Sequence, residues 1–519
     1  MVEFHLPVSD EANVKICEEN KSSRVIHFSK IQKSTYNEYS ELLSENGFEK
    51  KESFERDGHC FCAFAGDGVG YFLNYYATLS ELYIVEEKGT RYFEHSCKAK
   101  EAVCEPKITQ IPLEDFGLSY AVKLPDGRFI IFDGGFPFEP DATRLFNYLK
   151  SDSAGERPQI AAWILTHPHR DHFECFVVFM ELYGELVDIE ALYYCFPEAD
   201  DVENFPELDP PHKTNTAQTY IHKLNGLIER FSIPVFTTHT GQTYRIGDAT
   251  CEILASMDDS VHLSSAFNYM SLVIRMEIAD QVILWGADSG FSKVKLAKKH
   301  GKYLKSDILQ IPHHGFGCGA PEGEIEAYEL IAPAVCLMPT DNYYGFITYA
   351  IHKTSTRHVM TMPTTKEVIT GDYPRTLPLP YAPKKEAKAE LEKKILSGID
   401  ASGSCVWVFS GLSTANKDDL RFDILNMVQR TDATVFIELF FPDRNGKIKD
   451  IKVEVPACTI KNVDLDSDDL DSEWRYTNKF SLKTKGIPED SPFAIRFMSD
   501  VPVVITNKNR SASYHTVNR

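Results

Sequence analysis

The feature that most constrains this chain is a cluster of metal-binding side chains directly after a strand-like apolar run. Residues 160–165 are apolar without alternation, which predicts a strand buried on both faces. The positions that follow hold His167, His169, Asp171 and His172. Imidazole suits zinc, copper, iron and nickel, and carboxylate suits harder ions. Because ligands of α/β sheets bind beyond the carboxyl ends of strands, the sequence predicts a metal site at this strand end.

Two downstream segments repeat the pattern of an apolar run that ends on candidate ligands. Residues 282–287 lead into Asp288, a carboxylate that can bridge two cations and balance their charge. Residues 308–312 lead into the pair His313 and His314, followed by glycine. With three strand ends delivering ligands, we expect these side chains to meet at one edge of a sheet.

Taken together, these segments resemble the metallo-β-lactamase-fold hydrolases. The branch most similar to this chain is the metallohydrolase domain of bacterial DNA-uptake competence proteins and their soluble relatives. The resemblance covers residues 105–370, about half of the chain. It rests on six short motifs, which lie at residues 131–135, 166–172, 268–274, 286–288, 312–315 and 342–345.

The resemblance implies a site for two divalent metal ions, zinc being expected and manganese or iron being alternatives. His167 and His169 would bind one ion, and Asp171 and His172 would bind the other. Asp288 would bridge the two ions. Asp171 would also be the catalytic residue, because it would orient the attacking water or take its proton.

Other residues complete the implied site. His313 would be the last ligand of the second ion, with His314 as its rival for that role. Asp133 would lie outside the coordination sphere and orient the loop that carries the first ligands. Asn342 would lie on the substrate side of the site.

The chain departs from the family pattern at two positions. Asn268 stands where the broader superfamily has a histidine for the first ion, so that ion would be held more weakly or with more water. His239 and His262 are distant alternatives for the missing ligand. Phe346 follows a motif after which the competence relatives tend to have histidine, which leaves the substrate class open.

The expected fold class is α/β, a four-layer αββα metallo-β-lactamase fold with an N-terminal α+β domain and a C-terminal β-sandwich-like domain. A chain of 519 residues is too long for one ordinary core, and helical spacing at 36–43 followed by short apolar runs predicts the first domain. The predicted divisions are an N-terminal domain at 1–104, a hydrolase domain at 105–372, a proline-rich linker with a charged helix at 373–404, and a β-rich domain at 405–519.

Composition constrains the partners. Asp and Glu outnumber Lys and Arg by 76 to 55, which gives a formal net charge of −21 and disfavours binding to a long nucleic acid. A small, anionic substrate is expected instead. No apolar run is long enough for a membrane span, and the first residues do not look like an export signal, so we expect a cytoplasmic protein without a membrane partner. The 12 scattered cysteines suit a reducing compartment.

The sequence therefore predicts a hydrolase that uses a metal-bound hydroxide. Zinc lowers the pKa of bound water to about 7, which provides a nucleophile at neutral pH. A small phosphoester or phosphodiester is the expected substrate, because two metal ions can hold both the attacking and the leaving oxygen. Carboxylic esters, lactones and amides are the alternative substrates. A metal-binding scaffold without catalytic activity is the alternative of another class.

Overall fold

The computed structural model divides the chain into two compact units. One unit contains residues 1–345 and 349–394, and the other contains residues 346–348 and 395–519. The structure describes residues 13–19, 23–89, 97–153, 156–204, 217–260, 267–341, 345–346, 350–371, 374–401, 404–426, 432–442, 447–466, 470–472, 478–480, 487–488 and 490–507.

The first sheet of the hydrolase region combines an antiparallel meander with a parallel half. Its order is β14-β13-β11-β10-β9-β8-β22, and β12 also pairs with β11. The strands β10, β11, β13 and β14 run parallel, whereas β8, β9 and β22 are antiparallel to their neighbours. The bounds are β8 (Lys107–Gln110), β9 (Ser119–Lys123), β10 (Phe129–Asp133), β11 (Gln159–Ile164), β12 (Asp188–Ile189), β13 (Leu192–Tyr194), β14 (Val235–Thr237) and β22 (Arg375–Pro378).

The second sheet has the order β21-β20-β19-β18-β17-β16-β15-β7. Its strands β18 to β21 run parallel, and β15 to β18 are joined as antiparallel neighbours. The bounds are β7 (Cys97–Lys98), β15 (Thr243–Gly247), β16 (Ala249–Ala255), β17 (Val273–Ile278), β18 (Gln281–Trp285), β19 (Ile308–Gln310), β20 (Val335–Met338) and β21 (Glu367–Thr370).

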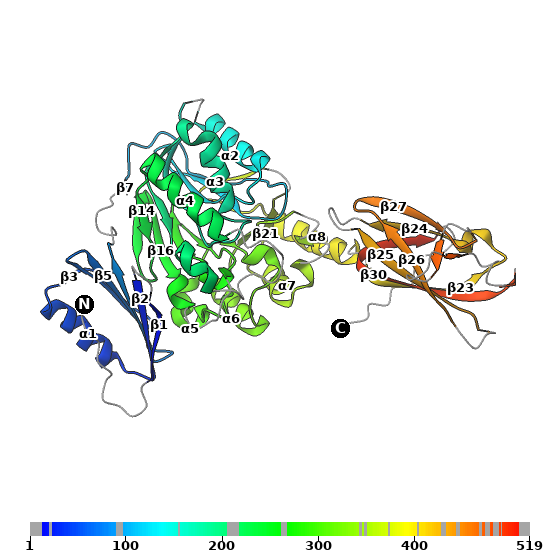
Figure 1. Cartoon of the computed structure of the whole chain (residues 1–519), viewed down its shortest axis with the longest axis horizontal. Helices are drawn as coiled ribbons and strands as arrows, with labels where there is room; N and C mark the ends of the chain where they lie inside the picture. Colours follow the sequence, from blue (N-terminus) through cyan, green and yellow to red (C-terminus); the bar gives the residue numbers. More distant parts are fainter. Residues whose placement is uncertain are drawn as a thin grey trace. The chain divides into compact units, whose positions relative to one another are not determined.

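The two sheets pack face to face between two layers of helices (Figure 1). Phe132 of the first sheet stacks on Trp285 of the second, with ring centroids 4.0 Å apart. On the outer face of the first sheet, Trp163 meets Phe176 of α3. The helices are α2 (Glu139–Asp152), α3 (Glu174–Tyr183) and α4 (Ala217–Phe231) in one layer, and α5 (Leu296–His300), α6 (Pro321–Ile331) and α7 (Thr354–Thr361) in the other. The predicted four-layer αββα fold is thus confirmed.

A six-stranded antiparallel sheet precedes the hydrolase layers, and its strands β4, β5 and β6 are buried on both faces. Its order is β1-β2-β6-β5-β4-β3. Phe64 and Leu73 face α1 (Lys33–Glu45), and Phe61 and Phe72, on the opposite face, join the hydrolase core. This double burial explains the nearly continuous apolar runs of the central strands. The strands are β1 (Asn13–Glu19), β2 (Ser23–Ser29), β3 (Glu49–Arg56), β4 (His59–Gly66), β5 (Val69–Tyr76) and β6 (Glu81–Lys88).

An ionic cluster joins this N-terminal sheet to the hydrolase sheets. The ring of His239 stacks on Phe72, and its two nitrogens face carboxylates, Nδ1 lying 3.1 Å from Asp258 and Nε2 lying 3.3 Å from Glu87. Burial opposes the charged form of His239, but Asp258 and Glu87 outweigh it and raise its pKa to about 10. Cys195 also comes within 4.8 Å of the cluster. Because both nitrogens already face carboxylates, we interpret His239 as an ion-paired cation and not as a metal ligand.

The proline-rich segment expected as a connector contributes a strand to the hydrolase region. Residues 375–378 form β22, which pairs with β8, and Leu377 and Leu379 are buried in the core. The charged helix predicted after it is α8 (Ala387–Ala401). The predicted boundaries at 104 and 372 stay predictions.

The C-terminal unit consists mainly of β-strands, as predicted. Their order is β27-β24-β30-β25-β26-β28-β29, with β23 beside β30. The bounds are β23 (Ser404–Ser413), β24 (Arg421–Asn426), β25 (Ala433–Phe440), β26 (Lys447–Val455), β27 (Thr459–Asp464), β28 (Leu470–Ser472), β29 (Asn478–Phe480) and β30 (Pro492–Asn507). Among the helices that the structure describes, none is long and apolar enough to cross a membrane.

Replacing His239 tests the ionic cluster. His239→Ala leaves Asp258 and Glu87 without the cation between them, and removal of one partner of a buried pair costs about 3–5 kcal/mol. We expect a loss of this size in the free energy of unfolding, measured in urea. The pKa of His239 is raised from about 6.5 to about 10, so its contribution is complete below pH 6.5 and disappears as the pH rises through 10.

The exposed pair of Arg230 and Glu185 provides the control. Glu185→Ala is expected to cost less than about 1 kcal/mol, because exposed pairs contribute little. Equal losses in the two variants would contradict the special role of His239.

Candidate metal centre

The candidate site lies where strands of both hydrolase sheets end. The ligand loop (residues 165–172) follows β11, Asp288 follows β18, and η6 (His313–Gly315) follows β19. The ligands therefore come from two sheets, with β11 in the first and β18 and β19 in the second, and not from one edge of a single sheet as the sequence predicted. Two groups of side chains form there, each with ligand atoms within 4.8 Å of one another; they are His167, His169 and Asp288, and Asp171, His172, Asp288 and His314.

The first group brings two imidazoles together with Asp288. Nε2 of His167 lies 3.1 Å from Nδ1 of His169 and 3.9 Å from the Asp288 carboxylate. Two nitrogens at the usual distance from one tetrahedral zinc would be about 3.3 Å apart. Burial, followed by the neighbouring His172 and His169, lowers the pKa of His167 well below its ordinary value. A neutral histidine with a free lone pair is the form that binds a metal ion.

The second group alternates imidazoles and carboxylates. Nε2 of His172 lies 3.2 Å from Oδ1 of Asp288, and Nε2 of His314 lies 3.0 Å from Asp171 and 3.4 Å from Asp288. Burial opposes charge on both histidines, but the carboxylates outweigh it and raise the pKa of His314 to about 10 and that of His172 well above its ordinary value. Protons on these rings balance the negative charge of the buried carboxylates. A metal cation bound in the site would balance the same charge in their place.

The buried polar atoms of the second group fit a metal ion. Within the described part of the chain, Nε2 of His172, Nε2 of His314 and Oδ1 of Asp288 are buried but make no well-aligned hydrogen bond. Such atoms are costly to bury unless a partner satisfies them. Imidazole nitrogens and carboxylate oxygens are also the donors that zinc prefers. Asp288 belongs to both groups, which is the position that a bridging carboxylate needs.

Asp133 holds the ligand loop from outside the two groups. Its carboxylate accepts hydrogen bonds from the backbone N–H of Thr166 (2.7 Å), from the Thr166 hydroxyl (2.6 Å) and from Nδ1 of His172 (2.7 Å). The bond from Nδ1 leaves Nε2 of His172 free to face the site. Thr166 was not singled out from the sequence, although its place between the strand and the first histidine is a signal that could have found it.

The structure brings His314, rather than His313, to the other ligands. His314 is 1% exposed, and its Nδ1 donates to the carbonyl of Pro339 (3.0 Å), so Nε2 faces Asp171 and Asp288. His313 is instead turned towards Gly317, whose carbonyl accepts from Nδ1 (3.0 Å). Both histidines have φ values near +50°, and this turn of the backbone decides which ring enters the site. The geometry therefore moves the ligand assignment from His313 to His314.

His313 contacts Asn268, the residue found where a histidine is usual. Nε2 of His313 lies 3.3 Å from Nδ2 of Asn268, which donates to it. His313 therefore fixes the orientation of this amide. His239 belongs to the ionic cluster of the N-terminal sheet, and His262 and Asn342 lie outside the described residues.

Several loops of the site have an unusual backbone conformation. Positive φ values are rare for residues other than glycine and cluster at functional sites, at a cost of about 1–3 kcal/mol each. In this site they occur at Asp133, Ala287, His313 and His314. Hydrogen bonds hold these loops in place, because Oε1 of Gln310 accepts from the N–H of Ala287 (2.6 Å) and the carbonyl of Ala287 accepts from the N–H of His313 (2.9 Å).

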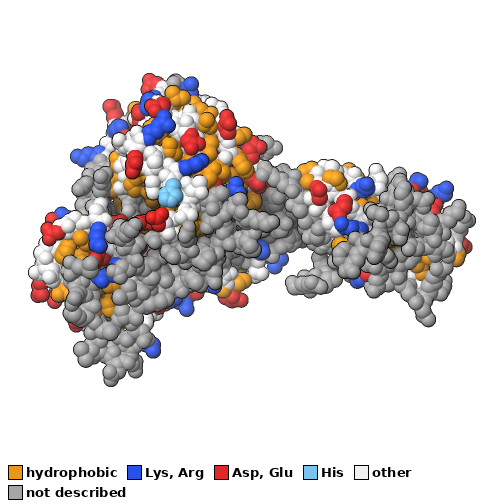
Figure 2. Space-filling model, viewed as in Figure 1, with side chains coloured by type: hydrophobic (Ala, Val, Ile, Leu, Met, Phe, Trp, Pro, Cys, Tyr) orange, Lys and Arg blue, Asp and Glu red, His pale blue; other side chains and the backbone are white. Residues whose placement is uncertain are grey.

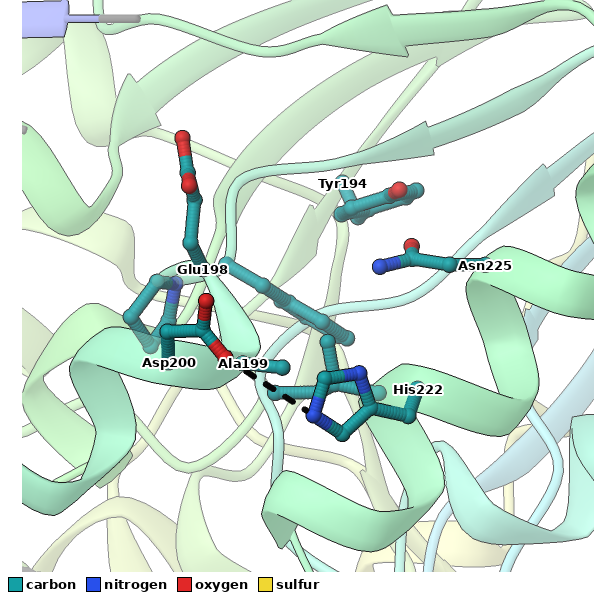
Figure 3. Close-up of a pocket in the computed structure, with 9 residues that line it drawn as sticks. Tyr194, Glu198, Ala199, Asp200, His222 and Asn225 are labelled. Carbon is teal, nitrogen blue, oxygen red and sulfur yellow. Dashed lines mark ion pairs between the residues drawn. The ribbon is translucent and has the colours of Figure 1, made fainter. Parts of the chain in front are cut away.

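A cavity of about 250 Å³ opens between the end of β13 and α4 (Figure 3). Tyr194 and Phe196 provide aromatic walls, and Asp200 faces His222 at 3.9 Å. Phe196 contacts Phe173, the residue that follows the ligand loop, with ring centroids 5.3 Å apart. The residues around the cavity were not predicted from the sequence.

The choice between the two adjacent histidines can be tested by metal content. His314→Ala removes a nitrogen that faces Asp171 and Asp288, so we expect zinc-loaded protein to lose about one ion per chain. His313→Ala is the matched control and should keep the wild-type stoichiometry. Elemental analysis after gel filtration measures both. The reverse result would restore His313 as the ligand.

The role of Asp133 predicts an effect on affinity rather than on stoichiometry. Asp133→Asn weakens the acceptor that fixes His172, and loss of such outer contacts typically lowers metal affinity by about 10–100-fold. Competition with a zinc-binding dye measures the affinity. The expectation fails if the variant binds zinc as tightly as the wild type while circular dichroism shows an unchanged fold.

Comparison with known proteins agrees with this geometry. Residues 113–249 match the family described as the metallo-beta-lactamase superfamily. No curated protein matches the sequence. Similar solved structures include the metallo hydrolase Igni18 from the archaeon Ignicoccus hospitalis (12% identity, 52% of this chain and 98% of that chain covered, TM-score 0.31), a beta-lactamase domain protein from Burkholderia ambifaria (15%, 38% and 59%, 0.24) and the Anabaena sensory rhodopsin transducer (24%, 20% and 96%, 0.16).

The TM-scores of these three structures are all below 0.5. The family match at residues 113–249 includes Asp133 and the whole ligand loop. The αββα layers and the two ligand groups agree with this family match. This chain therefore contains a metallo-β-lactamase superfamily domain.

Proposed function

We propose that this chain is a hydrolase with two divalent metal ions, zinc being the preferred metal, and that it cleaves a small phosphoester or phosphodiester. The observation that carries the proposal is the pair of ligand groups that share Asp288. Metal-dependent hydrolysis is the general chemistry of the superfamily that residues 113–249 match. Two ions bound there would activate water and stabilise both the attacking and the leaving oxygen of a displacement at phosphorus.

Asp171 is the residue we assign to proton transfer. Its side chain is 13% exposed, whereas those of Asp288 and His172 are 2% and 0% exposed. Asp171 is therefore the carboxylate of the second group that faces outwards, where a water molecule and a substrate can approach. Burial disfavours its charged form, but His172 and His314 outweigh this and lower the pKa of Asp171 below its ordinary value. An ionised carboxylate in this position can orient water and accept its proton.

The charge distribution supports a small anion as substrate rather than a long polymer. Arg170 lies between two candidate ligands and is 46% exposed, so it can reach a negatively charged group at the site. On the face shown in Figure 2, the described Lys and Arg side chains are scattered among Asp and Glu. A duplex would need a row of cations along its phosphates. We therefore propose that DNA and RNA are not cleaved.

The closer relationship to the competence-protein branch is also a proposal. Asn268 supports it, because this residue takes the place of the histidine that the broader superfamily has there. The two adjacent histidines would then have distinct roles. His313 orients the amide of Asn268 through their hydrogen bond, and His314 faces the metal centre.

Metal content and turnover of a substrate panel test this function together. Zinc- or manganese-loaded protein is expected to contain about two ions and to hydrolyse nitrophenyl phosphate or bis(nitrophenyl) phosphate faster than nitrophenyl acetate. Asp171→Asn should lower kcat/KM by about 100–1,000-fold. Asp288→Asn should also lose metal, because it removes a carboxylate shared by both groups.

The control variant is Asp248→Asn, which alters an exposed carboxylate in a loop and should keep full metal and activity. Preference for the acetate would move the assignment to carboxylic esters. Full turnover in Asp171→Asn would overturn the role of that residue. DNA and RNA, incubated at low salt with manganese, should stay intact; cleavage that disappears in Asp171→Asn would refute the small-molecule proposal.

A further inference from the structure

Three phenylalanine rings lie around the outer side of the second ligand group. Phe116 is at the centre, with its ring centroid 5.4 Å from that of His314, 5.5 Å from Phe136 and 5.9 Å from Phe316. The three residues come from different loops, which follow β8, β10 and β19. Each is only half-buried. Large apolar side chains that stay partly exposed next to a polar site are typical of a binding surface.

The loop that carries Phe116 is attached to the ligand loop by its backbone. The N–H of Leu118 donates to the carbonyl of Asp171 (3.1 Å). A Cβ atom on Gly117 would lie 2.9 Å from the same carbonyl, so only glycine allows this close approach. The position of Phe116 is therefore set by the ligand loop itself.

The other two rings are held in a similar way. The N–H groups of Gly134 and Gly135 donate to the carbonyl of His172 (2.9 and 3.1 Å), and they fix the segment that leads into Phe136. The hydroxyl of Thr356 donates to the carbonyl of Gly315 (2.7 Å), directly before Phe316. All three rings are thus preorganised around the metal centre, and a ligand would not have to order them on binding.

The side chain of Arg170 places a positive charge beside these rings. The guanidinium of Arg170 is 5.5 Å from the ring centroid of Phe136, within the range of a cation–π contact. Its Nε lies 3.8 Å from the buried carboxylate of Glu174, which is longer than a hydrogen bond. The outer side of the site therefore combines apolar ring faces with the positive charge of Arg170.

We propose that Phe116, Phe136 and Phe316 bind an aromatic group next to the scissile bond of the substrate, while Arg170 contacts its negative charge. This inference rests on the proposed hydrolase function and narrows its substrate class to aryl-bearing anions. The alternative is that the rings only pack against one another. All three rings stay partly exposed beside the second ligand group and a cation, whereas core rings such as Phe132 and Phe176 are 0% exposed, and this combination favours a ligand.

Binding of phosphonates, which cannot be hydrolysed like esters, tests the proposal without turnover. Titration calorimetry of the zinc-loaded full chain should give phenylphosphonate a Kd about tenfold lower than that of methylphosphonate, the size expected for one aromatic contact beyond burial. Phe116→Ala and Phe316→Ala should abolish most of this preference. Phe316→Leu, which keeps apolar bulk, guards against misfolding and should retain part of it. Arg170→Gln should weaken both phosphonates by a similar factor.

Phe48→Ala is the matched control. Phe48 is also half-buried and contacts the ring of Tyr71, but it lies between α1 and β3, in the N-terminal part of the chain. The Phe48→Ala variant should prefer phenylphosphonate over methylphosphonate as strongly as the wild type does. Equal affinities for both phosphonates in the wild type, or a preference that persists in Phe116→Ala and Phe316→Ala, would overturn the proposal.

A second pair of anions separates this proposal from the proposed function. Comparing the Kd of benzoate with that of acetate tests whether the rings bind an aryl group on an anion that contains no phosphorus. A preference for benzoate that the phenylalanine variants lose supports the aryl site even when no phosphoester is hydrolysed. Hydrolysis of phosphoesters without any preference for phenyl over methyl supports the hydrolase and refutes the aryl site.

Discussion

The buried carboxylate of Asp133 is the contact on which the rest of the site depends. It accepts from the backbone and hydroxyl of Thr166 and from His172, so one side chain at the end of β10 fixes both ends of the ligand loop. Without these bonds a loop rich in histidine would have many conformations of similar energy. Because Nδ1 of His172 is committed to Asp133, only Nε2 can face the metal centre. The tautomer and the position of a candidate ligand thus follow from a residue that binds no metal.

The ligand loop also positions the aromatic rings at the surface of the site. The carbonyl groups of Asp171 and His172 accept from the loops that carry Phe116 and Phe136. The backbone of the ligand loop therefore positions the rings, while its side chains form the metal centre. A chemical site and an apolar surface beside it are built on one rigid support, which is the arrangement that binding without reorganisation requires.

The N-terminal sheet packs against the hydrolase layers through apolar contacts and a buried ion pair. Phe61 and Phe72 join the hydrolase core, and Glu87 reaches His239 on the other side of the junction. Buried charges are expensive unless they are paired, so an ion pair at this junction favours one docked arrangement over others that would leave a charge unpaired. The sheet is thereby part of the same compact unit as the hydrolase layers.

Local sequence patterns were enough to predict the kind of fold and to propose the candidate ligands. An apolar strand followed within a few residues by candidate ligands, such as His167 or Asp288, is a local pattern that can be recognised in the sequence alone. Only the tertiary structure decided between His313 and His314, because the choice depends on two φ values near +50°. Tertiary contacts also gave His239 its place in an ion pair and brought Phe116, Phe136 and Phe316 together. The three phenylalanines come from loops that are separated in the sequence. The residues next to each of them in the chain do not show which other rings it contacts in the folded protein.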